Sequence, residues 1–345
     1  MTHLSIARAA FGAALAIAMP AALLYGQQDP APPAAPKKGP RRPPPNRPGV
    51  STPGVKREMA AITPVATFPV EGTPDWQAVT EDAIWVANGP KNTIHRLDPA
   101  TNQVVAAVTV GKRPCSGLAY GFGSIWSPSC GDKTLVRVDA KTNQVLATIP
   151  VGPAESEGGV TTGAGSVWLV SDPAGTLSRI DPATNKVTAE IKVPANSAAC
   201  LFADGAVWIT TPDASTLTRV DPATNAVAAT IPVGPKPRFL TAGAGSVWTL
   251  NQGDGTVTRV DSSSNKVLAQ IEVGVPGGGG EIAFGLGHVW ATVFSIPISE
   301  IDPATNQVIR QWTGAGGDSI RVAHGSIWLS NLRQQNLWRI DPKTL

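Results

Sequence analysis

The sequence predicts an all-β fold: a seven-bladed β-propeller with four-stranded blades, closed by an N-terminal strand that completes the last blade. Two motifs predict it, one of the form RIDPATNKV and one of the form GSVW, and each returns about every 40 residues. The composition agrees, because 35 Gly and 32 Pro accompany no long helical pattern. Short strands joined by tight turns are therefore favoured over helices.

Residues 1–26 have the pattern of a secretory signal peptide. A basic start at Arg8 precedes an apolar run from Ala9 to Leu24, and small residues follow, so we expect cleavage near Gly26. An uncleaved membrane anchor is the alternative. No later stretch is long and apolar enough to span a bilayer. We therefore expect a periplasmic or secreted protein with no transmembrane segment after cleavage.

Residues 27–60 form a Pro-rich basic segment that cannot bury a core, and we expect a disordered linker. Residues 27–58 hold seven Lys or Arg against two acids; with these and Arg8 set aside, 20 basic and 23 acidic residues remain in 59–345. The predicted propeller, residues 61–345, is thus mildly acidic, and nucleic acid is not an expected partner. The linker either touches an anionic envelope surface or is a soluble spacer.

Each repeat divides into four short strands, as the third unit illustrates. Its expected strands cover residues 158–164, 166–171, 176–181 and 186–193. Runs such as VTAEIKV alternate and are rich in β-branched residues, as is usual in strands. Gly-Ala-Gly turns the chain between the first two strands, and DPATN turns it between the last two.

The DPATN-type motif is interpreted as a turn that separates strands. Copies begin at Arg96, Arg137, Arg179, Arg219, Arg259 and Glu300, and a truncated copy begins at Arg339. In the third copy, the carboxylate of Asp181 accepts from backbone N–H groups of the turn, and Pro182 presets φ for its first corner. Thr184 caps the turn, and Asn185 tolerates the left-handed conformation that leads into the next strand. The alternative, a series of metal sites, is disfavoured because each turn offers one carboxylate.

The GSVW-type motif places a tryptophan in the middle of each second strand. These residues are Trp85, Trp126, Trp168, Trp208, Trp248, Trp290 and Trp328. Both faces of a blade pack on neighbouring blades, so we expect the rings to fill the interfaces. Seven such strands but six complete fourth strands are present. The segment from Ala66, ATFPVEGTP, resembles a fourth strand, so we expect residues 64–70 to pair with NLWRID of the last blade.

Units of this form resemble the YVTN-type propeller repeat, and more distantly the virginiamycin B lyase (streptogramin lyase)-like propellers. The resemblance covers about residues 62–345 and implies the fold rather than the function. That lyase family uses a Glu and a His two positions apart, with Mg²⁺, to open a cyclic depsipeptide. No Glu-x-His occurs here, and His95, His288 and His324 fall at the wrong places in the repeats. The lyase activity is therefore not carried over.

A candidate site is expected at the channel mouth, on the face that carries the loops from each fourth strand into the next blade. Aligning the repeats on their Trp places charged or aromatic residues at this level. They are Asp75, Trp76, Glu157, Arg238, Glu281, Asp318 and Arg321. Arg321 stands where the other repeats have small or apolar residues, so it needs a partner such as Asp318 or Glu281. A solvated or ion-paired rim without a ligand is the alternative.

Two functions remain open. The first is an exported scaffold that recognises an envelope component or a small molecule at the mouth, as a monomer. The second is a lyase-like or lactonase-like enzyme that uses the carboxylates of Asp75, Glu157, Glu281 and Asp318 with Mg²⁺ or Ca²⁺. The missing histidines on this face and the scattered charges favour the first. No P-loop, GxSxG or His-rich metal spacing is present.

The sequence contains three cysteines. Cys115 and Cys130 are equidistant from the turn in CSGLAYGFGSIWSPSC, so they should face each other across the first two strands of their blade. We expect a disulfide there, since export leads to an oxidising compartment. Cys200 is then a lone thiol that we expect to be buried and inert.

Overall fold

The computed structural model describes residues 52–345 except residues 116, 156, 275–276, 278 and 295. The chain divides into two units, 1–44 and 45–345, and all described residues belong to the second. The predicted signal peptide and the predicted linker up to residue 51 lie outside the described residues.

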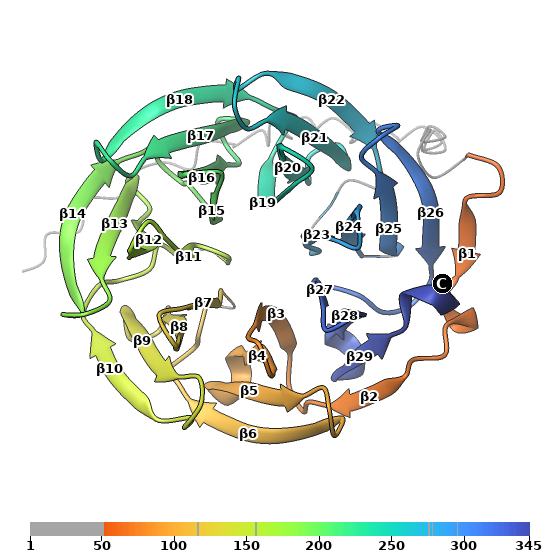
Figure 1. The fold of residues 1–345 in the computed structure, drawn as a ribbon, viewed down its shortest axis with the longest axis horizontal. Helices are drawn as coiled ribbons and strands as arrows, with labels where there is room; N and C mark the ends of the chain where they lie inside the picture. Colours follow the sequence, from red (N-terminus) through yellow and green to blue (C-terminus); the bar gives the residue numbers. More distant parts are fainter. Residues whose placement is uncertain (1–51, 116, 156, 275–276, 278, 295) are drawn as a thin grey trace, which may run out of the picture. The chain divides into compact units, whose positions relative to one another are not determined.

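The described unit is a ring of seven sheets around a central axis (Figure 1). From the channel outward, blade 1 consists of β3 (Pro74–Val79), β4 (Ile84–Asn88), β5 (Thr93–Asp98) and β6 (Gln103–Thr109). Blade 2 consists of β7 (Ala119–Gly121), β8 (Ser124–Ser129), β9 (Thr134–Asp139) and β10 (Val145–Ile149). Blade 3 consists of β11 (Val160–Gly163), β12 (Ser166–Asp172), β13 (Thr176–Asp181) and β14 (Lys186–Lys192).

The remaining blades continue the same order. Blade 4 consists of β15 (Cys200–Ala203), β16 (Ala206–Thr211), β17 (Thr216–Asp221) and β18 (Ala226–Pro232). Blade 5 consists of β19 (Pro237–Gly243), β20 (Ser246–Asn251), β21 (Thr256–Asp261) and β22 (Val267–Glu272). Blade 6 contains β23 (Ile282–Gly285), β24 (His288–Val293), β25 (Ile296–Asp302) and β26 (Gln307–Thr313). Blade 7 contains β27 (Ile320–Ala323), β28 (Ser326–Asn331) and β29 (Asn336–Ile340). Short 3-10 turns are η1 (Met59–Ala61), η2 (Gly89–Lys91), η3 (Leu332–Gln334) and η4 (Pro342–Thr344).

The N-terminal strand β2 (Ala66–Pro69) closes the ring, as the sequence predicts. It is the outer strand of blade 7 and pairs antiparallel with β29, with Phe68 opposite Leu337. The side chain of Phe68 is 1% exposed, and its ring centroid lies 5.5 Å from that of Trp328. The first and last segments of the propeller are thereby held in one sheet, which removes an unpaired edge.

A short strand upstream of β2 corrects the predicted domain boundary. Lys56–Glu58 forms β1, which pairs in parallel with the outer edge of β26 and gives blade 6 a fifth strand. Met59 follows it and is buried in the same apolar cluster as Trp312. The propeller therefore begins before residue 61, because the open edge of β26 accepts this segment and an apolar side chain anchors it.

The tryptophan series forms the core of the blades, as predicted. All seven indoles are at most 1% exposed. In six of them Nε1 donates to the backbone carbonyl five residues earlier, at 3.0–3.1 Å, as from Trp168 to Gly163. Trp85 differs, because its Nε1 has no partner among the described residues. Six of the seven indoles are thus fixed within their blades by a hydrogen bond as well as being packed.

The DPATN turns have the predicted geometry. The carboxylate of Asp181 accepts from the backbone N–H of Ala183 at 2.9 Å and from the hydroxyl of Thr184 at 2.8 Å. These hydrogen bonds, chiefly that of Ala183, hold the pKa of Asp181 below its usual range. Asn185 has a φ of 58°, the left-handed conformation expected at this position. The motif therefore separates strands, as interpreted from the sequence.

The arginine of the motif has a role that the sequence analysis did not assign. Arg179 lies over the ring of Trp168, with its guanidinium carbon 4.9 Å from the centroid, and its Nε donates to Ser166 Oγ at 2.8 Å. Its Nη1 reaches the turn of the next blade and donates to Pro222 O and Asn225 Oδ1, both at 2.8 Å. The same contacts recur for Arg137, Arg259 and Arg339. The repeated motif thus joins neighbouring blades as well as turning the chain.

Candidate functional site

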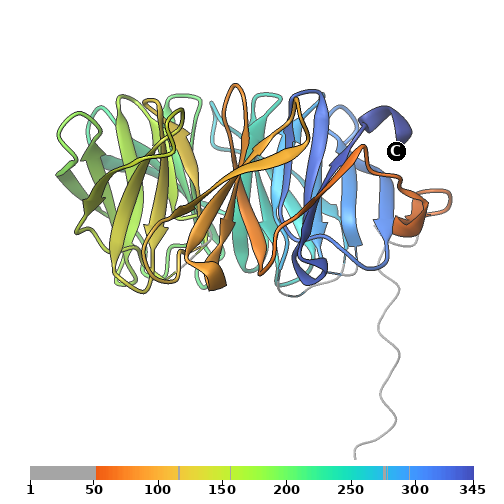
Figure 2. The same ribbon diagram turned by 90° about the horizontal axis from the view of Figure 1, so that it is seen from below.

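One face of the propeller carries the loops that enter each inner strand and the loops between second and third strands. The Gly turns and DPATN hairpins lie on the opposite face, because strands alternate in direction (Figure 2). All seven predicted site residues belong to the first face, where they form contacts across the ring. We call this set the mouth cluster: Asp75, Trp76, Glu157, Arg238, Glu281, Asp318 and Arg321.

Trp76 on β3 spans the channel mouth. Its side chain is 9% exposed, and its ring centroid lies 5.3 Å from that of Phe239 in blade 5. The guanidinium carbon of Arg321 in blade 7 lies 5.0 Å from the Trp76 ring centroid. A Cβ placed on Gly158 in blade 3 would lie 2.6 Å from the ring, so only glycine fits there. Trp76 therefore occludes the mouth by contacting three other blades and does not present its ring on the surface.

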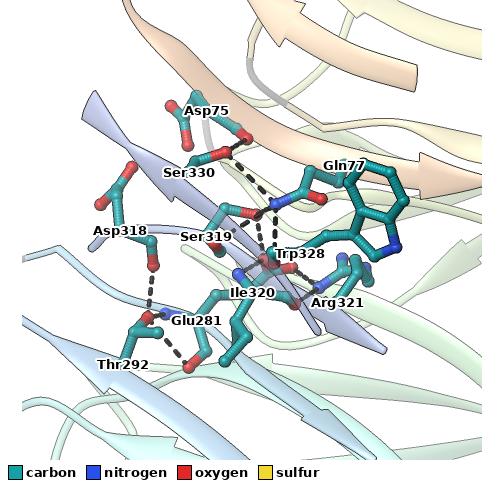
Figure 3. A network of polar contacts seen from close by, with 10 residues as sticks. All are labelled: Asp75, Gln77, Glu281, Thr292, Asp318, Ser319, Ile320, Arg321, Trp328 and Ser330. Atoms are coloured by element: carbon teal, nitrogen blue, oxygen red, sulfur yellow. Dashed lines mark hydrogen bonds and ion pairs between the residues drawn. The ribbon is translucent and has the colours of Figure 1, made fainter. Parts of the chain in front are cut away.

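Glu281 is buried and accepts hydrogen bonds from blade 7 (Figure 3). Its carboxylate forms an ion pair with Arg321 and accepts from the hydroxyl of Ser319 and from the backbone N–H of Ile320, the last at 3.1 Å. Of the two partners that the sequence analysis offered for Arg321, Asp318 and Glu281, the structure pairs it with Glu281. Burial raises the pKa of Glu281 to about 7, although Arg321 and the other donors oppose the shift.

Asp318 connects blades 6 and 7 to blade 1. Its Oδ1 accepts from the backbone N–H of Gly280 at 3.2 Å, and Thr292 Oγ1 donates to its carbonyl. Burial raises the pKa of the Asp318 carboxyl, and a hydrogen bond with the side chain of Asp75 opposes that shift. The predicted carboxylates at positions 75 and 318 are thus brought together, with the backbone carbonyl of Asp75 accepting from Ser330 Oγ at 2.9 Å (Figure 3).

Gln77 is a residue of this region that the sequence analysis missed. It is 1% exposed, and its side-chain nitrogen donates to Ser319 O at 3.3 Å, Trp328 O at 3.4 Å and Ser330 Oγ at 3.2 Å. These bonds join blade 1 to blade 7 where the ring closes. The alignment of the repeats on their Trp could have revealed Gln77 as an exception, because the other repeats have Leu, Val, Cys or Ile at this position.

The other half of the mouth cluster borders an open pocket. Arg238 Nη2 lies 3.2 Å from Glu157 Oε2, and both side chains are near 40% exposed, at 37% and 42%. The pocket has a volume of about 270 Å³, and we call it the mouth pocket. Its lining residues are Arg113, Pro114, Cys115, Cys130, Glu155, Glu157 and Arg238. The sequence analysis also missed Arg113 and Glu155 as site residues, although it placed the loops that carry them on this face.

Cys115 and Cys130 form the predicted disulfide, with Cα atoms 5.2 Å apart. The backbone on either side is held as well, since Cys115 N donates to Pro128 O and Cys130 N to Arg113 O, both at 2.9 Å. Cys200 is buried, as expected, and burial raises the pKa of its thiol. The disulfide therefore fixes one wall of the mouth pocket.

Replacing both Cys115 and Cys130 by serine should lower the free energy of unfolding by about 3 kcal/mol, because the bridge closes a loop of about 15 residues in the unfolded chain. Urea denaturation of the variant and of the wild type with and without reductant measures this. A Cys200→Ala variant, in which the bridge remains, serves as the control and should keep the reductant sensitivity. An unchanged midpoint in the double variant would contradict the assignment of the bridge in solution.

Within the described residues, the mouth has neither a cluster of metal-binding side chains nor any of the three histidines of the repeats. No group of three or more His, Cys, Asp or Glu side chains is placed there to hold an ion. His95 lies on β5, contacts Thr93 Oγ1 at 3.0 Å, and has its pKa lowered by burial. His288 Nδ1 lies 2.5 Å from Glu300 Oε1 near the hairpin face. Two carboxylates of the mouth cluster, those of Glu157 and Glu281, are instead paired with arginines.

A second cavity lies in the channel and is lined by Trp76. Its volume is about 160 Å³, and its walls come mostly from the inner strands, with Leu118, Val160, Leu201 and Leu240 among them. Trp76 and Arg321 are also part of its lining. Trp76 and its partner Arg321 therefore border this cavity as well as contacting each other.

Comparisons with known proteins bear on the fold. A family model described as a repeat of unknown function (DUF6923) matches residues 156–280. No curated protein matches the chain. A streptogramin B lyase structure is 17% identical, with a TM-score of 0.67, over 79% of this chain and 93% of that chain.

Two further solved structures are similar. Virginiamycin B lyase from Staphylococcus aureus is 14% identical, with a TM-score of 0.69, over 80% of this chain and 98% of that chain. Hydrazine synthase from Kuenenia stuttgartiensis is 13% identical, with a TM-score of 0.67, over 80% of this chain and 97% of that chain. This chain shares their propeller fold. The resemblance found in the sequence is therefore confirmed for the fold.

Within the described part of the chain, no helix has the length and apolar character needed to cross a membrane.

Proposed function

We propose that this protein is an exported propeller that binds a ligand or a protein partner at the channel mouth as a non-catalytic recognition scaffold. The observation that supports this best is the mouth pocket, in which exposed charges of both signs stand on a rigid frame. Loops on a rigid scaffold are the usual place for recognition. The buried half of the mouth cluster keeps this frame in shape, because its polar groups bond to one another.

Export and a monomeric state belong to the same proposal. The apolar N-terminal segment in the sequence and the disulfide at the mouth pocket both support an oxidising compartment outside the cytoplasm. The pairing of β2 with β29 supports a monomer, since it completes the ring within one chain. An envelope component or a small molecule of that compartment is the partner class we propose.

Arg238→Ala is expected to abolish retention of this partner on the immobilised protein, because it removes the guanidinium that faces the mouth pocket. The experiment passes an extract of the host's cell envelope over wild type, Arg238→Ala and Glu190→Ala. Glu190 is exposed on β14, away from the pocket, so this matched variant should behave as wild type. If no component retained by wild type is lost in Arg238→Ala, recognition at the mouth is refuted.

A second candidate, a divalent-metal-dependent lyase or lactonase-like hydrolase, is favoured by the fold shared with virginiamycin B lyase. It would use the carboxylates of Asp75, Glu157, Glu281 and Asp318 with Mg²⁺ or Ca²⁺. The residues present fit such an ion poorly, because a cation would have to displace Arg321 from Glu281 and Arg238 from Glu157. We therefore prefer the recognition role.

Neither Mg²⁺ nor Ca²⁺ is expected to raise the melting temperature of protein treated with a chelator. An ion that binds the folded state at about 100 times its Kd would add about 2.7 kcal/mol, which a thermal scan detects. A rise that is present in wild type and absent in Glu281→Ala would establish a metal site in the mouth cluster and favour the enzyme. A rise that persists in this variant would indicate an ion bound elsewhere.

A further inference from the structure

The mouth pocket has a fixed wall that suits a small ligand. The disulfide joins the two chain segments that form this wall. The backbone N–H of Arg113 donates to Asn92 Oδ1 at 2.8 Å. Arg113 adopts a φ of 48°, a conformation that the surrounding bonds hold in place. With a volume of about 270 Å³, the pocket is below the usual size for drug-like ligands. A rigid wall reduces the loss of entropy on binding.

The charges that line this pocket are exposed pairs that a ligand can exchange. Arg113 Nη2 lies 3.3 Å from Glu155 Oε1, with both side chains at least 60% exposed. Glu155 is also paired with Lys133 at 3.1 Å, so it keeps a cation when Arg113 turns to a ligand. Exposed ion pairs contribute at most about 1 kcal/mol each, so giving one up is inexpensive. Arg113 and Arg238, each in a solvent-accessible ion pair, are therefore available to an incoming carboxylate.

Glu157 decides which ligands are accepted. Arg238 is its paired cation, at 3.2 Å, and opposes the rise in the pKa of Glu157 that burial causes. If a ligand carboxylate takes the guanidinium of Arg238, the partly buried Glu157 carboxylate is left without its paired cation. A simple anion would therefore be disfavoured, whereas a ligand that also brings an ammonium group restores the neutralising charge at Glu157. The pocket thus selects for opposite charges on one small molecule.

We infer that the mouth pocket binds zwitterions of the amino-acid class, free amino acids or short peptides, with the carboxylate on Arg113 and Arg238 and the ammonium on Glu157. This inference rests on the proposed recognition function and names its ligand class. Pro114 and the disulfide offer an apolar surface for the ligand's side chain. No covalent step is involved.

Ligand-observed NMR followed by calorimetry tests the inference on the wild-type protein. The probes are the proteinogenic amino acids and L-alanyl-L-alanine, and each hit is compared with its N-acetylated form and its C-terminal amide. We expect saturable binding by at least one probe, weakened about tenfold or more by either cap, since each cap removes a charge-assisted contact. Glu157→Gln should weaken the uncapped hit by a similar factor and should not weaken the N-acetylated form. Glu190→Gln is the matched control and should bind as wild type.

Three outcomes would overturn the inference. One is the absence of saturable binding by every probe up to about 10 mM, a weaker affinity than a two-charge site should give. The second is equal binding of a hit and its N-acetylated form, which would make the pocket a simple anion site. The third is binding that Glu157→Gln leaves unchanged. In each case the retention experiment with Arg238→Ala still decides the proposed function, because that experiment assumes no ligand class.

Discussion

Replacing Phe68 by alanine is expected to lower the free energy of unfolding by about 4 kcal/mol. The ring is 1% exposed and packs with Trp328, Ile84 and Val86, which belong to blades 7 and 1. The substitution leaves a cavity at the junction where β2 joins the last blade. Urea denaturation followed by tryptophan fluorescence measures the loss.

Val65→Ala is the matched control for this prediction. Val65 lies just before β2 and is 55% exposed, so its truncation should change stability by no more than about 0.5 kcal/mol. A loss below about 1 kcal/mol in Phe68→Ala would mean that β2 does not close the ring in solution. Because the closure places the ends of the blade series in one sheet, that result would also remove the basis for the geometry of the mouth.

Glu281→Ala is expected to destabilise the protein by about 3 kcal/mol, because three donors lose their acceptor in a buried place. They are the guanidinium of Arg321, the hydroxyl of Ser319 and the backbone N–H of Ile320. Arg321 lies over Trp76, so its release also loosens the side chain that occludes the channel mouth. The loss is measured by urea denaturation at neutral pH.

Two variants separate this network from a general effect of removing a charge. Glu272→Ala removes an exposed carboxylate at the end of β22 and should change stability by no more than about 0.5 kcal/mol. Arg321→Ala should cost much less in the Glu281→Ala background than in wild type, because its partner is already absent. Additive losses would show that the two side chains are not coupled.

The pH dependence of stability provides a second readout for Glu281. The pKa of this carboxyl is about 7 in the fold against an ordinary value of 4.5, so between these values the folded state binds a proton that the unfolded chain has released. Its contribution to stability is complete below the ordinary pKa and is lost as the pH rises through 7. Glu281→Gln keeps an acceptor and does not titrate, so its stability should fall less steeply than that of wild type across this window. Parallel profiles would contradict the raised pKa.

Much of the fold was predictable because its determinants are local and repeated. The Asp181 and Asn185 pair indicates a turn within five residues, and Trp168 marks the middle of a second strand. The disulfide followed from two cysteines placed symmetrically about a hairpin. Strand β1 was not predictable, since its three residues have no alternating pattern and depend on an edge formed about 250 residues later in the chain.

The sequence by itself determined the number of blades, the level of each side chain along its strand and the closure by β2, because backbone propensity and a fixed period act over short stretches. It therefore placed the residues of the mouth cluster near the same end of the inner strands. Only the tertiary structure decided their partners: Trp76 against Phe239, Glu281 with Arg321, and Glu157 with Arg238 across the channel. Side chains far apart in the chain meet according to the curvature of the closed ring and the rotamers that burial permits, and no local pattern encodes either.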